Sequence, residues 1–166
     1  MFTGLNFAIP QALARRNELY VTSLGEDSVF RYNADTGEFL GTFISSKGEL
    51  DAPDGFAFGP DGNIYLSGYF SNNIVKYDGK TRESLGVFAS GIDGPAELLF
   101  DREGNLLVNR FGTEQTRCNL VNRCSILKYD GKTGASLGVF ASGNGLDGPD
   151  GLAFGPDNEL YVTSFL

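Results

Sequence analysis

PDGFAFGPDGNIYLSG, residues 53–68, is the stretch that decides the fold, because most of the chain is this unit written again. It returns as PAELLFDREGNLLVNR from Pro95 and as PDGLAFGPDNELYVTS from Pro149, and a shorter form, PQALARRNELYVTS, begins at Pro10. Such self-similarity is typical of proteins that stack one small structural unit many times. Residues that repeat therefore predict the scaffold, and residues that break the repeat are better guides to function.

Each unit contains four short segments with the composition of β-strands, separated by turns rich in Pro, Asp and Gly. In the second unit the segments are FAF from Phe56, IYLSG from Ile64, NIVKYD from Asn73 and SLGVFAS from Ser84. Four antiparallel strands in a unit of roughly 40 to 50 residues are the pattern of a β-propeller blade. We therefore predict an all-β fold.

The spacing of the units sets the predicted organisation. The period is 42 residues from Pro53 to Pro95 (95 − 53) and 54 from Pro95 to Pro149 (149 − 95). Ten of the twelve extra residues enter the third unit within FGTEQTRCNLVNRC, and the other two lengthen the SGNG stretch at Ser142. We predict one domain, 1–166, with blades at about 8–46, 51–91 and 93–143 and a half blade at 147–166. Propellers close with typically four to eight blades. About three and a half four-stranded blades should form an open arc that needs completion by more blades or another copy.

The core PDGLAFGPD, followed by ILKYDGKTG and LGVF, resembles NHL-repeat propellers and, more distantly, the gluconolactonase and streptogramin-lyase propellers. The resemblance covers essentially the whole chain and implies the fold, whereas propellers host many unrelated activities. In gluconolactonase-like propellers the residue after the proline of the PDG segment can bind the catalytic metal, so the resemblance suggests this role for Asp54 and Asp150.

The other units depart from that metal pattern. The position holds Ala96 in the third unit and Gln11 in the first, and a hard cation such as calcium needs about six to eight oxygen ligands. We therefore expect no metal site and no cofactor, with calcium as the one candidate. In the alternative interpretation, Asp54 and Asp150 organise the turn into the strand through backbone hydrogen bonds.

Charge and hydropathy exclude several partners. The chain has 13 basic and 21 acidic residues and a net charge of −8, which on average repels nucleic acid and anionic lipid. No apolar run approaches the roughly 20 residues that span a bilayer, and residues 1–10 lack the pattern of a signal peptide. We expect neither a nucleic-acid nor a membrane partner, and we expect an extracellular or cell-surface location.

The two cysteines, Cys118 and Cys124, both lie in the inserted segment. A disulfide between them would close a small loop and contribute about 2 kcal/mol on the chain-entropy model. Two reduced thiols are the alternative, because pairing depends on an oxidising compartment. A zinc site is not expected, because the spacing is wrong and the chain has no histidine.

The third unit breaks the repeat on one face. Connections between the second and third strands and between successive blades should share that face, so the insertion should lie beside the PDG positions. We expect a rim there that binds a protein loop or an anionic or carbohydrate-like ligand. An ion pair between Glu97 and Arg110 is the other interpretation. The candidate rim residues are Asp54, Glu97, Asn109, Arg110, Arg117, Arg123 and Asp150.

Catalytic patterns are missing from the sequence. It has no histidine, no GxSxG motif and no visible partner that would activate a cysteine. We predict a non-catalytic binding module that self-associates, as a homo-oligomer or filament, through an assembly edge at Val162, Phe165 and Leu166. The alternatives are a metal-dependent lactonase or hydrolase with Asp54 and Asp150 as partial ligands, and a functionless fragment of a longer propeller.

Overall fold

The computed structural model describes residues 17–46, 48–112 and 124–165, and it builds these residues into four antiparallel sheets without a helix. The first sheet contains β1 (Glu18–Ser23), β2 (Ser28–Asn33) and β3 (Phe39–Ser45). The second contains β4 (Pro53–Phe58), β5 (Ile64–Gly68), β6 (Asn73–Tyr77) and β7 (Ser84–Ser90). The third contains β8 (Pro95–Phe100), β9 (Leu106–Arg110), β10 (Ser125–Tyr129) and β11 (Ser136–Ser142). The last contains β12 (Pro149–Phe154) and β13 (Leu160–Ser164). The predicted all-β class is confirmed.

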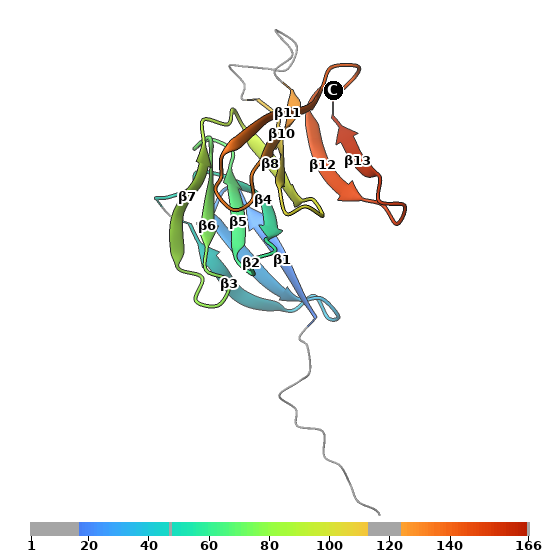
Figure 1. Cartoon of the computed structure of the whole chain (residues 1–166). Coiled ribbons are helices and arrows are strands. Elements are labelled where there is room, and N and C mark those ends of the chain that lie inside the picture. Colours follow the sequence, from blue (N-terminus) through green and yellow to red (C-terminus); the bar gives the residue numbers. More distant parts are fainter. Residues whose placement is uncertain (1–16, 47, 113–123, 166) are drawn as a thin grey trace, which may run out of the picture.

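The sheets follow one another as the blades of an open arc, from the first sheet in blue to the β12–β13 hairpin in red (Figure 1). In both complete blades the strands lie in sequence order, β4-β5-β6-β7 and β8-β9-β10-β11, and β4, β8 and β12 are neighbours along the inside of the arc. We call these three the innermost strands. An arc of four-stranded propeller blades was predicted and is confirmed; the predicted first strand of blade 1 lies outside the described residues.

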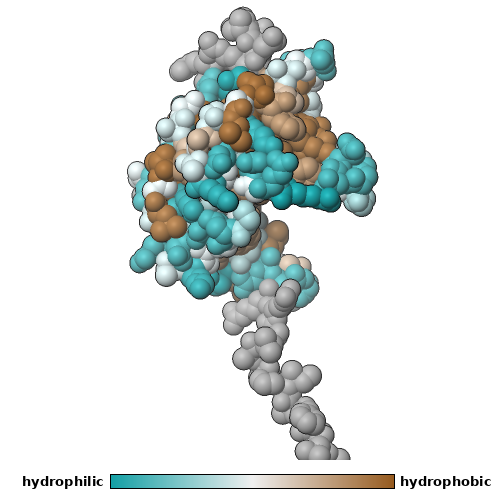
Figure 2. All heavy atoms as spheres, viewed as in Figure 1, coloured by the Kyte–Doolittle hydropathy of each residue, from teal (hydrophilic) through white to brown (hydrophobic). Residues whose placement is uncertain are grey.

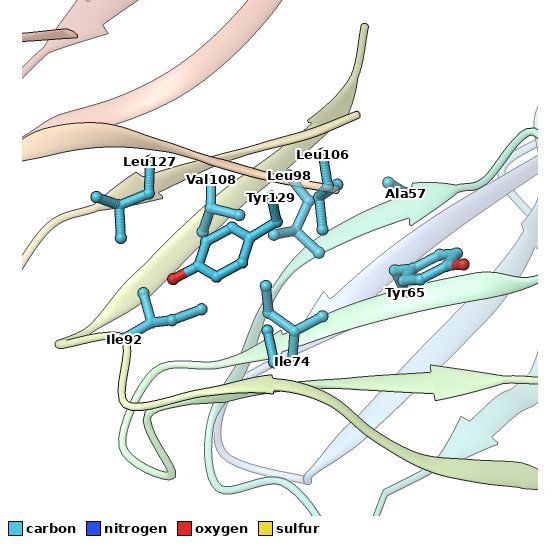
Figure 3. Close-up of a cluster of buried hydrophobic side chains, with 10 residues drawn as sticks. Ala57, Tyr65, Ile74, Ile92, Leu98, Leu106, Val108, Leu127 and Tyr129 are labelled. Carbon is cyan, nitrogen blue, oxygen red and sulfur yellow. The ribbon is translucent and has the colours of Figure 1, made fainter. Parts of the chain in front are cut away.

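Packing between blades forms two hydrophobic clusters. One lies between the first two blades and contains Val29, Ile44 and Leu66 among others. The other lies between the second and third blades, where Ile74 and Ile92 point toward Tyr129 (Figure 3). Neither cluster includes a described residue of the β12–β13 hairpin. The interior of the fold therefore lies between the faces of successive sheets, as expected for stacked blades.

Repeated glycines bend the outer strands. Gly41, Gly86 and Gly138 have φ values of 116°, 94° and 96°, and each lies in the outermost strand of its blade where the register with the neighbouring strand shifts. Residues other than glycine rarely adopt this backbone conformation. The LG dipeptide of each SLGVF-like segment therefore marks a β-bulge that increases the local twist of the blade.

Repeated aspartates organise the turns, as the sequence indicates. In the turn after β6, Asp78 Oδ1 accepts hydrogen bonds from the N–H groups of Lys80 and Thr81, both at 2.8 Å. Asp130 forms the same pair of bonds in the next blade, at 3.0 and 2.8 Å. These bonds lower the pKa of both carboxyl groups. The aspartates of the DGKT turns thus serve the scaffold.

Candidate functional site

A second type of bulge places the residues of the predicted rim. In the second blade, Pro53 pairs with Gly68 and Phe56 pairs with Leu66, so Asp54 and Gly55 together lie opposite a single residue, Ser67. The pairing in the next two units leaves Ala96 and Glu97 opposite Asn109, and Asp150 and Gly151 opposite Thr163. Bulges of this kind re-aim side chains. Each innermost strand therefore presents the residue after its proline at an irregular backbone position.

The residue opposite each bulge also contacts the next blade. Ser67 Oγ accepts a 2.7 Å hydrogen bond from the Gly55 N–H and donates one, also 2.7 Å, to the carbonyl oxygen of Ala96 in β8. Thr22 Oγ1 donates to the Asp54 carbonyl at 2.7 Å, and Asn109 Nδ2 donates to the Asp150 carbonyl at 2.7 Å. We call this side-chain bond from one blade to the innermost strand of the next the clamp. It satisfies backbone groups that the bulge leaves without ladder partners.

The clamp was not predicted from the sequence. Thr22, Ser67, Asn109 and Thr163 share the fourth position of the LYVTS-like segment, and all four carry a hydrogen-bonding side chain. That regularity was the available signal. An alternating strand pattern does not distinguish a small polar residue facing solvent from one that bonds a neighbouring sheet, so the role required the structure.

Three carboxylates from three innermost strands interact at the rim. Burial raises the pKa of Asp54, and the negative charge of Asp150 raises it further. Burial also raises the pKa of Glu97; the Leu98 N–H, which donates to Glu97 Oε1 at 3.3 Å, opposes this, and the charges of Asp54 and Asp150 add to it. All the charged groups that shift these two pKa values are acidic. The structure therefore brings Asp54, Glu97 and Asp150 into one electronegative group, the acidic trio.

Two further candidates lie near the acidic trio. Asn109 is fully buried, and its Oδ1 atom has no hydrogen-bond partner among the described residues. Arg110 follows it and lies close enough to Tyr129 for its charge to oppose the rise in the Tyr129 pKa that burial causes. Within the described ranges, no ion pair joins Arg110 to Glu97.

The inserted segment and the chain end lie only partly within the described residues. Arg117, Cys118, Arg123 and Leu166 lie outside the described residues. Cys124 is buried, and its Sγ lies 3.3 Å from the carbonyl oxygen of Phe111. At the predicted assembly edge, Val162 is half-buried, whereas Phe165 is 74% exposed. The disulfide and the assembly edge stay predictions.

The opposite face of the arc carries a cavity of about 600 Å³. Its lining carries charges of both signs, from the acidic Asp61, Glu103 and Asp130 and the basic Lys76, Arg102 and Lys132. Lys76 Nζ forms an ion pair with Asp61 at 2.8 Å. None of the predicted site residues lines this cavity. It lies among the turns, where the balanced charges give no clear preference for an anion or a cation.

The part of the chain that the structure describes contains no group of three or more acidic, histidine or cysteine residues arranged to hold a metal ion. The acidic trio therefore does not fit the metal centre that the gluconolactonase resemblance suggests. The described residues also include no helix long and apolar enough to cross a membrane.

The fold has clear structural relatives, although no family profile and no curated protein matches the sequence. A chain in the crystal structure of a nidogen–laminin complex is similar with a TM-score of 0.67 and 22% identity over 90% of this chain and 53% of that one. A gluconolactonase from Xanthomonas campestris gives 0.64 and 20%, over 91% and 52%. Virginiamycin B lyase from Staphylococcus aureus gives 0.60 and 17%, over 90% and 46%.

These similarities show the fold, and they confirm the predicted likeness to NHL-type, gluconolactonase-like and lyase-like propellers at that level. The chain spans about half the length of the solved structures that it matches.

Proposed function

We propose that the chain is a non-catalytic propeller module with two binding surfaces. The acidic trio at the rim takes a cationic side chain of a protein partner, and the open ends of the arc mediate self-association. The observation that carries the rim proposal is the grouping of Asp54, Glu97 and Asp150: burial raises the pKa values of Asp54 and Glu97, and repulsion from the neighbouring carboxylates raises them further. A positive charge placed among these carboxylates would relieve that repulsion.

A basic peptide tests the rim. The probe is a short peptide with two arginines, compared with the same peptide carrying neutral citrulline. We expect binding that weakens as NaCl is raised, and an affinity at least ~5-fold lower for the Asp54→Asn/Glu97→Gln double variant. The matched control is Glu38→Gln/Glu83→Gln, which removes two exposed acids elsewhere in the described chain. Equal binding by all three proteins would refute the rim proposal.

A hydrolase is the rival function, favoured by the likeness to a gluconolactonase. The absence of histidine from the sequence and the misfit of the described carboxylates to a metal weigh against it. Lactone hydrolysis that needs calcium or zinc and is lost in Asp150→Ala, together with a metal-dependent rise in melting temperature, would replace the binding proposal with this one.

Self-association and location complete the proposal. Light scattering measures the solution mass: a defined dimer or polymer supports self-association through the open ends, and a stable monomer that binds no hydrophobic dye contradicts it. An extracellular location is supported by the two cysteines of the inserted segment and by the similarity to a chain from a nidogen–laminin complex.

A further inference from the structure

Contacts between successive blades follow one scheme. Besides the clamp, at the first two blade junctions an aromatic residue two positions before the clamp residue packs against the last residue of the next innermost strand; at the third junction this position holds Leu107. Tyr20 meets Phe58 at a ring-centroid distance of 5.7 Å, and Tyr65 meets Phe100 at 4.9 Å, both edge to face. The clamp acceptor and this phenylalanine are always four residues apart, as in Asp54 and Phe58. One blade thus recognises two points on the next innermost strand at a fixed spacing.

A row of aromatic residues adds a third contact. Tyr69, Phe111 and Phe165 each follow the second strand of their unit directly. Tyr69 and Phe111 lie 6.2 Å apart, and Phe111 and Phe165 lie 6.5 Å apart, measured between ring centroids. The row therefore runs from blade to blade and ends, within the described residues, at the exposed ring of Phe165.

The β12–β13 hairpin carries all three groups, and its own contacts already set their positions. Thr163 Oγ1 accepts the Gly151 N–H at 2.8 Å, as Ser67 accepts that of Gly55, yet among the described residues it donates to no carbonyl. Tyr161 donates its hydroxyl to Asp157 at 2.7 Å, as Tyr65 does to Asp61 at 3.0 Å. Tyr65 is completely buried and Tyr161 is 56% exposed. The hairpin has the geometry of a blade face whose neighbour is missing.

The glycine at position 151 supports the same conclusion. A Cβ atom on Gly55 would collide with the carbonyl oxygen of Ala96, so glycine is what lets β8 approach β4 closely. Gly151 occupies the same position in β12, and its backbone does not have a positive φ. A Cβ there would meet only Thr163, at 2.9 Å. Gly151 therefore leaves room for the close approach seen between β4 and β8, whereas β8 carries Glu97 at this position and still contacts β12.

We propose that the β12–β13 face is a docking site for the innermost strand of a further propeller blade, a segment of the form Pro-X-X-apolar-X-Phe. The second residue of that strand offers its carbonyl oxygen to the Thr163 hydroxyl. Its phenylalanine, four residues later, covers Tyr161, and an aromatic residue of the same blade extends the row from Phe165. This deepens the association through open ends proposed above.

The expected sequence pattern of the partner strand is the one that the three innermost strands of this chain share. PDGFAF, PAELLF and PDGLAF, the sequences of β4, β8 and β12, share this pattern. Hydrophobic residues gather where β12 and β13 lie, beside a hydrophilic hairpin tip (Figure 2). An apolar surface alone would accept many partners, but the clamp adds a polar contact at a fixed distance from the aromatic one. These combined requirements select a propeller strand over an arbitrary apolar peptide.

A peptide titration tests the site on the full chain. The probe is the peptide DAPDGFAFGPDG, which copies residues 51–62, and the readout is the shift of backbone amide resonances in NMR spectra. We expect the largest shifts at Gly151, Tyr161 and Thr163. Replacing the second phenylalanine of the peptide by alanine should weaken binding at least ~10-fold, because that ring supplies most of the buried apolar area.

Protein variants distinguish peptide binding through the clamp from nonspecific hydrophobic binding. Thr163→Val should weaken peptide binding ~5-fold or more by removing the hydrogen bond, whereas Thr163→Ser, which copies Ser67, should keep the affinity. Leu137→Ala removes an exposed apolar side chain from β11 and should change nothing. No amide shifts in β12 and β13, or equal affinity for both peptides, would overturn the docking site. If the chain binds the peptide but is a monomer in solution, the proposed self-association is wrong and the docking site stands.

Discussion

Ser67 shows how one small side chain can join two blades. It is completely buried, and its hydroxyl group bonds the Gly55 N–H of its own blade and the Ala96 carbonyl of the next. Both bonds involve backbone groups that no strand ladder satisfies at the bulge. Such a residue contributes to stability mainly because its loss would leave buried polar groups without hydrogen-bond partners.

Replacing Ser67 by alanine should therefore lower the free energy of unfolding by about 2–3 kcal/mol. Urea denaturation followed by circular dichroism measures the change. Ser90→Ala is the matched control, since Ser90 is exposed in β7, and it should stay within about 0.5 kcal/mol of the unchanged chain. A similar stability of the two variants would mean that water replaces the hydroxyl group in the clamp.

Gly55 should tolerate substitution poorly. The Cβ atom of Gly55→Ala would collide with the Ala96 carbonyl and lie 3.0 Å from the backbone of Glu97. Because backbone atoms cannot move aside cheaply, we expect a loss of about 3 kcal/mol. Gly25→Ala is the control, because nothing lies within 4 Å of its Cβ position and its φ is not positive. Thermal unfolding of the two variants should differ by several degrees.

Asp54 should make the fold less stable at neutral pH than at mildly acidic pH. Its pKa is raised in the folded chain, first by burial and then by Asp150. The folded state therefore binds the proton more tightly than the unfolded state, and this contribution to stability falls as the pH rises from about 4 through the raised pKa. Asp54→Asn removes the charge, so we expect its melting temperature at pH 7 to rise by about 2–4 °C.

The pH profile separates this effect from a general gain in stability. The advantage of Asp54→Asn over the unchanged chain should shrink as the pH is lowered toward 4, because the native carboxyl group takes up a proton as the pH falls through its raised pKa. Asp61, Asp78, Asp101 and Asp130 have lowered pKa values, so both proteins should lose stability at still lower pH. A constant difference between the two melting temperatures from pH 7 to 4 would contradict the assigned cause.

Among the elements, the hairpins and their turns were predictable because their signals are local. Gly59 to Asn63 and Asp78 to Arg82 carry turn residues at fixed spacing, and the strands on either side have matching composition. The bulges at Asp54 and Gly86 were not predicted, since register depends on the partner strand. The acidic trio was predicted to share a face. Its mutual repulsion depends on how close successive innermost strands lie, which the sequence does not state.

The β12–β13 hairpin should open before the rest of the molecule. Its strands contribute no residue to either hydrophobic cluster of the described chain, and Tyr161 and Phe165 are largely exposed. Local opening has a low free energy where few apolar contacts hold an element. In hydrogen–deuterium exchange, peptides covering residues 149–164 should exchange faster than those covering 64–77. Equal protection in a dilute, monomeric sample would refute this expectation.

For the whole molecule, the repeat made the arc predictable, because four strand segments per unit allow few arrangements other than a blade. The count of blades followed from Pro53, Pro95 and Pro149. What the pattern could not give is the chemistry of the blade faces. From the sequence, Thr163 is one more polar residue of a strand. Its role becomes clear only from the structure, in which Ser67 and Asn109, at the equivalent positions, bond the neighbouring blade.

The clamp has a consequence for how such a chain can evolve. It recognises the backbone carbonyl of Asp54, Ala96 or Asp150, and it makes no demand on the side chain at that position. Mutation can therefore exchange that side chain while the clamp between blades persists. Substitutions during evolution can thus change the side chains of the inner rim one at a time while the fold stays the same.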